Sequence, residues 1–290
     1  MLRRRWMIKS RFKKMEHPVH PIAAAVVEAI DHGFAETARK KGEKPRCYIG
    51  ASTGHECIAK MQLSLRGAPN DPVEPRTQRI FREGHRLEDQ VVRDLKRMAN
   101  LRVYEKDLMT GRQHRAEWLG GHVVCHSDGL VDLEDGSDPL ILEIKSMNDA
   151  NFKKFKTYGV KASHRHYYSQ MQMMMAMFKI ERSFFISYCK NTSGYHAEIV
   201  PFDQEMWDEI YSNIQAALDG HSWRVSSTPN DWRCKMCFKR TQCWENPPLP
   251  PSPQMCKHSR PTPDGDFACP YGCNGTNVCE KYEQIKMEAK

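Results

Sequence analysis

The fold of this chain is decided by the stretch Leu140-Ile141-Leu142-Glu143-Ile144-Lys145-Ser146. Alternate side chains of a strand point to opposite faces, so Leu140, Leu142 and Ile144 can enter a core. Glu143 and Lys145 then share the other face. Burying an acid and a base on so apolar a strand is costly unless another group compensates, and a divalent cation held by carboxylates is the usual compensation. The stretch therefore predicts a buried strand beside a Mg²⁺ or Mn²⁺ site.

Acidic side chains that could complete this site precede the strand. Asp128 stands fifteen residues before Glu143, in a strand-like segment that ends at Asp132, a rival metal ligand. Further upstream, a helix is expected over 77–98, with Glu88 and His85 on the same side as its apolar residues. An unpaired carboxylate on an apolar stripe is costly, so Glu88 is expected to have a partner.

The remaining periodicity predicts an α/β domain in which helices flank a mixed central sheet. Two more helices are expected before the strands, and the strands up to residue 146 are expected to form an antiparallel meander. The expected helices are 21–41, 52–67, 77–98, 149–158, 164–178 and 203–218, and the expected strands are 102–108, 116–119, 123–133, 140–146, 183–189 and 195–201.

In this order, the helix acid, the Asp, the Glu-x-Lys pair and Gln170 on a later helix resemble the PD-(D/E)XK nuclease superfamily, closest to its RecB-like exonuclease branch. The resemblance implies a restriction-endonuclease-like core. It also implies that the metal is held by Glu88, with His85 as a further ligand, by Asp128 and Glu143, and by the backbone carbonyl of Ile144. Lys145 is implied to orient or help deprotonate the attacking water and to stabilise charge on the phosphate.

The match is imperfect on the helix that carries Gln170. The RecB branch has a Tyr four residues after the Gln, where this chain has Met174, and Tyr167 is the nearest substitute. Gln170 is expected to touch substrate or Lys145. The methionines at 171, 173, 174, 175 and 177 are interpreted as adaptable core packing, and Cys125 and Cys189 as buried small apolar residues.

Eleven cysteines, an odd number, and the short Cys234-x-x-Cys237 spacing favour metal-binding thiolates over a secreted disulfide scaffold. Cys234, Cys237 and Cys243 lack a fourth partner for a tetrahedral site or a cluster. Similarity to the iron–sulfur staple of AddB-type and CRISPR-associated nucleases implies that Cys57 is this partner and that the site holds [4Fe–4S], with Zn²⁺ as the alternative. Cys47 is the alternative fourth ligand.

A second cysteine group follows a Pro-rich stretch at 247–253. It predicts a small zinc-ribbon-like module, because so short a segment without a core needs a metal to fold. Its candidate ligands are Cys256, His258, Cys269, Cys273 and Cys279. The expected layout is a basic tail and helix at 1–45, a nuclease core with the cysteine staple at 46–245, and the linker and module at 246–290.

The net charge is +8, yet seven Lys or Arg and no acid fall within residues 1–15, so the basicity belongs to a tail. Such a tail could touch nucleic acid, target an organelle or have no role. No apolar run could span a bilayer, so no membrane partner is expected.

The predicted function is a Mg²⁺- or Mn²⁺-dependent exonuclease acting on single-stranded DNA or duplex ends in recombination, repair or replication. Recombination or replication proteins are the expected partners. The expected location is the cytoplasm of a bacterium or phage-infected host, or the mitochondrion. The rival is a non-catalytic nucleic-acid-binding or scaffold protein with zinc sites.

Overall fold

The computed structural model describes residues 20–42, 45–54, 56–134, 136, 138–273 and 278–289. The basic tail at 1–15 lies outside these residues, so its three readings stay predictions. Among the residues described, no helix is both long enough and apolar enough to cross a membrane.

A five-stranded mixed sheet forms the centre of the molecule, as predicted, with the strand order β2-β5-β6-β7-β8. Strand β6 pairs in parallel with β7, placing Glu143 opposite Phe185 and Lys145 opposite Ser187. The other neighbours pair antiparallel. The strands are β2 (Arg102–Tyr104), β5 (Gly129–Asp132), β6 (Leu140–Met147), β7 (Arg182–Cys189) and β8 (Tyr195–Pro201).

The expected single meander is wrong, because residues 123–133 form two strands in two different sheets. Strand β4 (Val123–His126) lies in a three-stranded sheet between β1 (Ile49–Gly50) and β3 (Arg115–Trp118), and β5 joins the central sheet. The chain changes sheet at Ser127 and Asp128, where the Asp128 carboxylate accepts a hydrogen bond from the backbone N–H of Ile144 at 2.8 Å. This long-range contact holds Asp128 beside β6.

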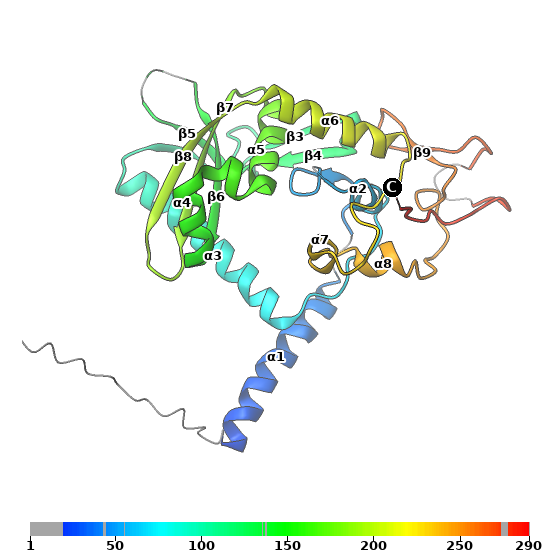
Figure 1. Cartoon of the computed structure of the whole chain (residues 1–290), viewed down its shortest axis with the longest axis horizontal. Coiled ribbons are helices and arrows are strands. Elements are labelled where there is room, and N and C mark those ends of the chain that lie inside the picture. The colour runs from blue at the N-terminus through cyan, green and yellow to red at the C-terminus, as the bar shows by residue number, and fades with distance from the viewer. Residues whose placement is uncertain are drawn as a thin grey trace, which may run out of the picture.

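Helices cover both faces of the central sheet (Figure 1). On one face, Leu140, Leu142 and Ile144 form a core with α3 residues such as Val92 and Leu95. On the other face, Ile141 packs in a larger core with Phe155 of α4 and with the buried methionines of α5, which confirms the predicted packing role of those methionines. The principal helices are α1 (Pro21–Lys41), α2 (Ile58–Leu65), α3 (Pro75–Arg97), α4 (Asp149–Ser163), α5 (Arg165–Phe178) and α6 (Gln204–Leu218).

The helix expected from Ser52 begins only at Ile58. Residues 50–54 form a turn instead, in which the Thr53 side chain accepts from the Gly50 N–H and donates to the Gly50 carbonyl, each at 2.9 Å. Hydroxyl side chains that bond the nearby backbone in this way compete with helix formation. Cys57 consequently stands at the N-cap of α2, at the edge of the helix rather than within it.

The C-terminal residues pack on α2. Met255, Ile285 and Met287 share a small apolar cluster with Ala59 and Leu63, so the C-terminal segment has part of its core in common with the nuclease region. Figure 1 shows this segment at the end of the molecule away from β8. Its short elements are α7 (Trp232–Lys235), α8 (Arg240–Trp244), β9 (Arg260–Pro261) and β10 (Phe267–Ala268), and a 3₁₀ turn covers Leu119–Gly121.

Candidate active site

An ion pair between the buried Glu143 and the partly buried Lys145 lies at the centre of β6. The Glu143 carboxyl is 1% exposed, and its Oε1 accepts from both Lys145 Nζ and the Gln170 side-chain amide, the latter at 2.9 Å. Gln170 reaches the pair from α5, so the predicted convergence of strand and helix occurs. Its partner is Glu143 rather than Lys145. Gln170 therefore fixes the orientation of the carboxylate.

Electrostatics keep Lys145 charged. Burial alone would lower the pKa of the Lys145 ammonium, but the carboxylates of Glu143 and Asp128 outweigh it, so its pKa lies above the ordinary value. The ammonium also lies 5.5 Å from the ring centroid of Tyr167, a cation–π contact. Lys145 is therefore a fixed positive charge at neutral pH.

Asp128 is the second carboxylate of the site. Burial raises the pKa of its carboxyl, while Lys145 and the hydrogen bond from Ile144 oppose that rise. The same two carboxylates interact with each other, since Asp128 also raises the pKa of Glu143, whose main cause of elevation is burial. When ionised, two desolvated carboxylates and one ammonium have a net negative charge, which a bound cation would neutralise.

Glu88 lies across a small cavity from Asp128. The cavity has a volume of about 190 Å³, and its lining includes Glu88, Asp128 and Ile144. His85 contacts Glu88 through Nδ1 at 3.3 Å, but both side chains are more exposed than predicted, at 79% and 36%. The buried stripe of α3 runs instead through residues 87, 91, 92 and 95, so Glu88 lies at its margin. Its partner is His85, on the exposed side of the helix, rather than a group on a buried face.

The rival candidates lie elsewhere. Asp132 accepts a hydrogen bond from the backbone N–H of Glu134 at 2.8 Å, an ordinary turn contact at the end of β5. Met174 is fully buried in the core, so no polar group stands where the family has its Tyr. Tyr167 occupies the space next to Lys145 instead, as the sequence suggested. Burial raises the pKa of its phenol.

The donor set fits a hard divalent cation, because Glu88, Asp128, Glu143 and the Ile144 carbonyl are oxygen ligands of the kind Mg²⁺ and Mn²⁺ prefer. Among the described residues, however, no group of three or more His, Cys, Asp or Glu side chains is arranged so that it could hold a metal ion. Glu143 is bound to Lys145 and Gln170 instead. The residues are near one another, and ligation would require Glu143 to share or exchange these partners.

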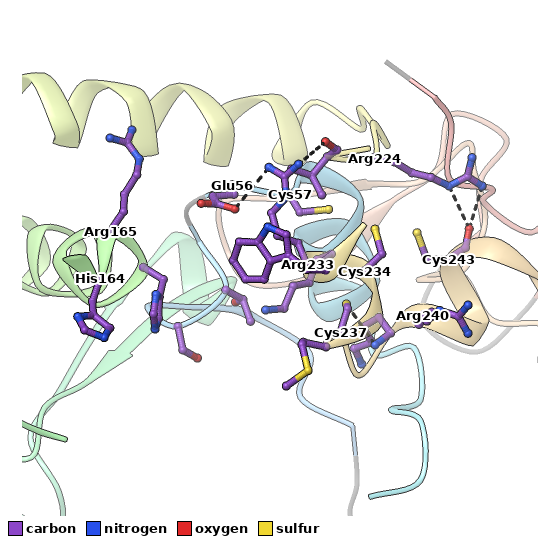
Figure 2. Close-up of a pocket in the computed structure, with 18 of the residues that line it drawn as sticks. Glu56, Cys57, His164, Arg165, Arg224, Arg233, Cys234, Cys237, Arg240 and Cys243 are labelled. Carbon is purple, nitrogen blue, oxygen red and sulfur yellow. Dashed lines mark hydrogen bonds and ion pairs between the residues drawn. The ribbon is translucent and has the colours of Figure 1, made fainter. Parts of the chain in front are cut away.

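The first cysteine group converges despite its separation in sequence. Cys57, Cys234, Cys237 and Cys243 all line one cavity of about 770 Å³. Figure 2 shows them gathered where α2 meets α7 and α8. Burial raises the pKa of the Cys57 and Cys243 thiols, the latter to about 12. Among the described residues these thiols, too, are not arranged so that they could hold a metal ion, so neither the iron–sulfur nor the zinc assignment is supported. Cys47 is exposed and does not line the cavity.

The second cysteine group is divided. Cys273 is hydrogen-bonded to Cys279 and Cys269, which raises the pKa of its thiol to about 11. Cys256 is buried, and its backbone carbonyl accepts from Arg66 at 2.9 Å. The five predicted ligands therefore do not form one site, and the described residues contain no zinc-binding arrangement here.

Residues 50–181 match the family model described as the YqaJ-like viral recombinase domain. This part of the chain is similar to a viral recombinase. The matched residues cover a little under half of the chain and include all of the candidate nuclease residues from His85 to Gln170. With the mixed sheet, the match supports the predicted PD-(D/E)XK-type fold. The iron–sulfur branch of that superfamily stays a prediction.

Solved structures similar to this chain include two exonucleases. The alkaline exonuclease LHK-Exo from Laribacter hongkongensis shares 18% identity, covering 66% of this chain and 91% of its own, with a TM-score of 0.43. A phage related exonuclease from Haemophilus somnus 129PT shares 15% identity, covering 59% of this chain and 91% of its own, with a TM-score of 0.44. Such distant likenesses place no individual residue of the site. No curated protein sequence gives a match.

Proposed function

We propose that this protein is a divalent-metal-dependent exonuclease that degrades DNA in recombination. The broad activity, a DNA exonuclease in recombination, agrees with the YqaJ-like match of residues 50–181. The observation that carries the finer proposal is the buried Glu143–Lys145 pair, oriented by Gln170 and placed beside Asp128. A non-catalytic scaffold has no need to maintain two desolvated carboxylates and an ammonium in one place.

The residues of the site would divide the work of phosphodiester hydrolysis. Glu88, Asp128, Glu143 and the Ile144 carbonyl would hold Mg²⁺ or Mn²⁺, with His85 at the margin. When bound, such an ion lowers the pKa of water and neutralises phosphate charge. Lys145 remains protonated, so it would stabilise the negative charge that grows on the phosphate rather than take a proton from water. Gln170 would keep Glu143 oriented.

Removal of divalent metal is expected to abolish hydrolysis. End-labelled single-stranded and duplex DNA would be incubated with the protein in Mg²⁺, in Mn²⁺ and in excess EDTA. We expect label to be released from linear DNA only with metal, while covalently closed circular duplex stays intact. Degradation in EDTA would contradict the metal proposal, and cutting of the circle would contradict exonuclease action. DNA binding without hydrolysis under any condition would favour the scaffold alternative.

We further propose that the four converging cysteines hold a [4Fe–4S] cluster, with Zn²⁺ as the alternative. Support comes from their placement on one cavity from three separate elements. Cluster ligation would join α2 to α7 and α8. In the C-terminal segment, the residues proposed for Zn²⁺ are Cys256, Cys269 and Cys279, with His258 or Cys273 as the fourth ligand.

Substitution Cys57→Ser is expected to remove most of the bound iron, whereas Cys47→Ser, the matched control, should retain it. Iron, sulfide and zinc would be quantified in anaerobically purified protein, together with its visible thiolate-to-iron absorption. The reverse pattern would make Cys47 the fourth ligand. Colourless wild-type protein that contains zinc alone would contradict the cluster.

A further inference from the structure

The cysteine-lined cavity extends beyond the cysteines to the start of α5. Its cysteine-lined part lies between α2 and the α7–α8 segment, while His164 and Arg165 border its other side (Figure 2). Lys154 of α4 and Trp232 of α7 also line it. The cavity therefore has one wall in the YqaJ-like segment and another in the C-terminal residues that follow it. Neither the proposed hydrolysis nor the proposed cluster accounts for the part of the wall that carries no cysteine.

The lining is strongly cationic. It contains seven Lys and Arg side chains but a single carboxylate, Glu56, which lies 3.9 Å from Arg233. Two of the cations also pair with carboxylates outside the lining: Arg165 with Glu209 at 2.6 Å and Arg233 with Asp231 at 2.8 Å. Lys60 and Lys154 have no carboxylate within 4.0 Å among the described residues, and the Nε of Arg240 is buried without a hydrogen-bond partner there. Uncompensated cations in a concave site concentrate a positive potential. The cavity is therefore suited to an anion with several charges. The seven cationic residues are Lys60, Lys154, Arg165, Arg224, Arg233, Lys239 and Arg240.

An aromatic side chain stands within this positive surface. Trp232 is 71% exposed, an unusual state for so large an apolar group. An exposed indole among cations offers a stacking surface for a base, while the cations take the phosphates. Bases in a duplex already stack on their neighbours, so only an unpaired base presents its face freely. A volume of about 770 Å³ also suits one or a few nucleotides.

The cavity borders side chains that contact the candidate active site. His166 lines it, and the His166 ring centroid lies 3.9 Å from that of Tyr167. The Tyr167 ring in turn contacts Lys145, whose Nζ lies 5.5 Å from the centroid. One contact chain thus joins the cationic cavity to the ammonium of the nuclease site. A strand held in the cavity would have its neighbouring phosphodiester near Lys145.

We propose that this cavity binds an unpaired DNA strand, with a base stacked on Trp232 and phosphates beside Lys60 and Lys154, and directs that strand to Lys145. The proposal rests on the proposed nuclease function for its choice of DNA. Binding, however, needs only the cavity and no hydrolysis. It can therefore be measured separately from catalysis.

The stacking contact is tested by fluorescence anisotropy with the full chain, a labelled single-stranded oligonucleotide and EDTA to prevent cleavage. Trp232→Ala is expected to weaken binding about tenfold, within the range for loss of one stacked base. Tyr158→Ala is the control, since Tyr158 is similarly exposed at 67% but lies outside the cavity lining. Equal binding by wild type and Trp232→Ala, or an equal loss in the control, would overturn the stacking assignment.

The phosphate contact is tested by salt dependence. For single-stranded DNA, each phosphate contact that is lost reduces by about 0.7 the steepness with which the logarithm of the association constant falls against the logarithm of the salt concentration. Lys154→Gln should show this reduction, while Lys156→Gln, on the same helix but outside the lining, should keep the wild-type slope. Circular dichroism melts of each variant would establish that the protein is folded, and because Lys154 and Trp232 are exposed, we expect wild-type melts.

Binding of each variant to a blunt duplex of the same length is measured as well, to distinguish a single-strand site from a duplex groove. Losses for the single strand that exceed those for the duplex support the proposal. Losses confined to the duplex would overturn it in favour of a duplex groove. If the variants bind the single strand normally while Mg²⁺-dependent hydrolysis persists in wild type, the cavity assignment fails and the nuclease proposal stands. If no hydrolysis occurs but binding falls as expected, the nuclease proposal fails and the strand site stands.

Discussion

Replacement of Lys145 by methionine is expected to lower the rate of DNA hydrolysis by about 10³-fold or more, because it removes the fixed positive charge of the site. The neighbouring carboxylates hold the pKa of Lys145 above its ordinary value, so the ammonium is present across the neutral range. Glu143→Gln should have a loss of similar size, since a neutral amide cannot serve as an anionic ligand. The measurement is release of label from linear DNA with Mg²⁺.

Loss of activity must be separated from loss of fold, because Glu143 is 1% exposed. Lys145→Met leaves that carboxylate buried without its partner, at a cost of about 3–5 kcal/mol. The double variant Glu143→Gln/Lys145→Met removes both charges and should be nearly as stable as wild type. It should nevertheless be inactive.

Lys153→Met is the matched control, because Lys153 also pairs with a carboxylate, Asp149, but on the surface and 73% exposed. This variant should keep both the wild-type activity and the wild-type melting temperature. A double variant that melts like wild type and hydrolyses DNA within about tenfold of it would refute the site assignment.

Long elements with a clear period were predictable from sequence. Helix α1 begins and ends at the expected residues, with Pro21 as its first residue and Gly42 after its last. Strand β8 also has its expected bounds, since a turn at 191–194 precedes it. In these segments the local conformational preference of the residues agrees with the final packing, so the sequence alone predicted where the elements begin and end.

The break at Asp128 could not be predicted. Residues 123–133 were predicted as one strand, and at the break Asp128 accepts a hydrogen bond from the backbone of Ile144, sixteen residues away. The exposure of Glu88 was missed for a related reason. A helix pattern shows which residues share a face, but docking against β6 determines how that face is rotated.

Some residues of the candidate site could likewise be predicted from the sequence and others could not. The set of Asp128, Glu143, Lys145 and Gln170 was predictable because the residue types and their order carry the chemistry. The cationic cavity was not, because its wall joins residues of α2, α4, α5 and α7 that no local motif relates. Trp232 gave no signal in the sequence beyond its presence. Only the folded chain shows that it is exposed among cations.

Arg66 was also missed, and Arg66→Gln is expected to destabilise the protein by about 3–5 kcal/mol. Its guanidinium is 3% exposed and donates to Gln62 of α2 at 2.7 Å. It also donates to the Gln254 and Cys256 carbonyls and to the side chain and carbonyl of Ser259. Burial lowers the pKa of Arg66 to about 10, so the group is still charged at neutral pH. One side chain therefore joins α2 to several acceptors of the C-terminal segment.

The measurement combines thermal unfolding with limited proteolysis. Arg66→Gln should lower the melting temperature and speed trypsin cleavage after Lys257, because the C-terminal segment loses its main polar attachment to α2. Arg66→Lys should recover little, since a lysine cannot reproduce the fork of the guanidinium. Arg97→Gln, at the exposed end of α3, is the control and should match wild type. If Arg66→Gln melts and is cleaved like this control, the C-terminal segment is held by its apolar contacts with Ala59 and Leu63 alone.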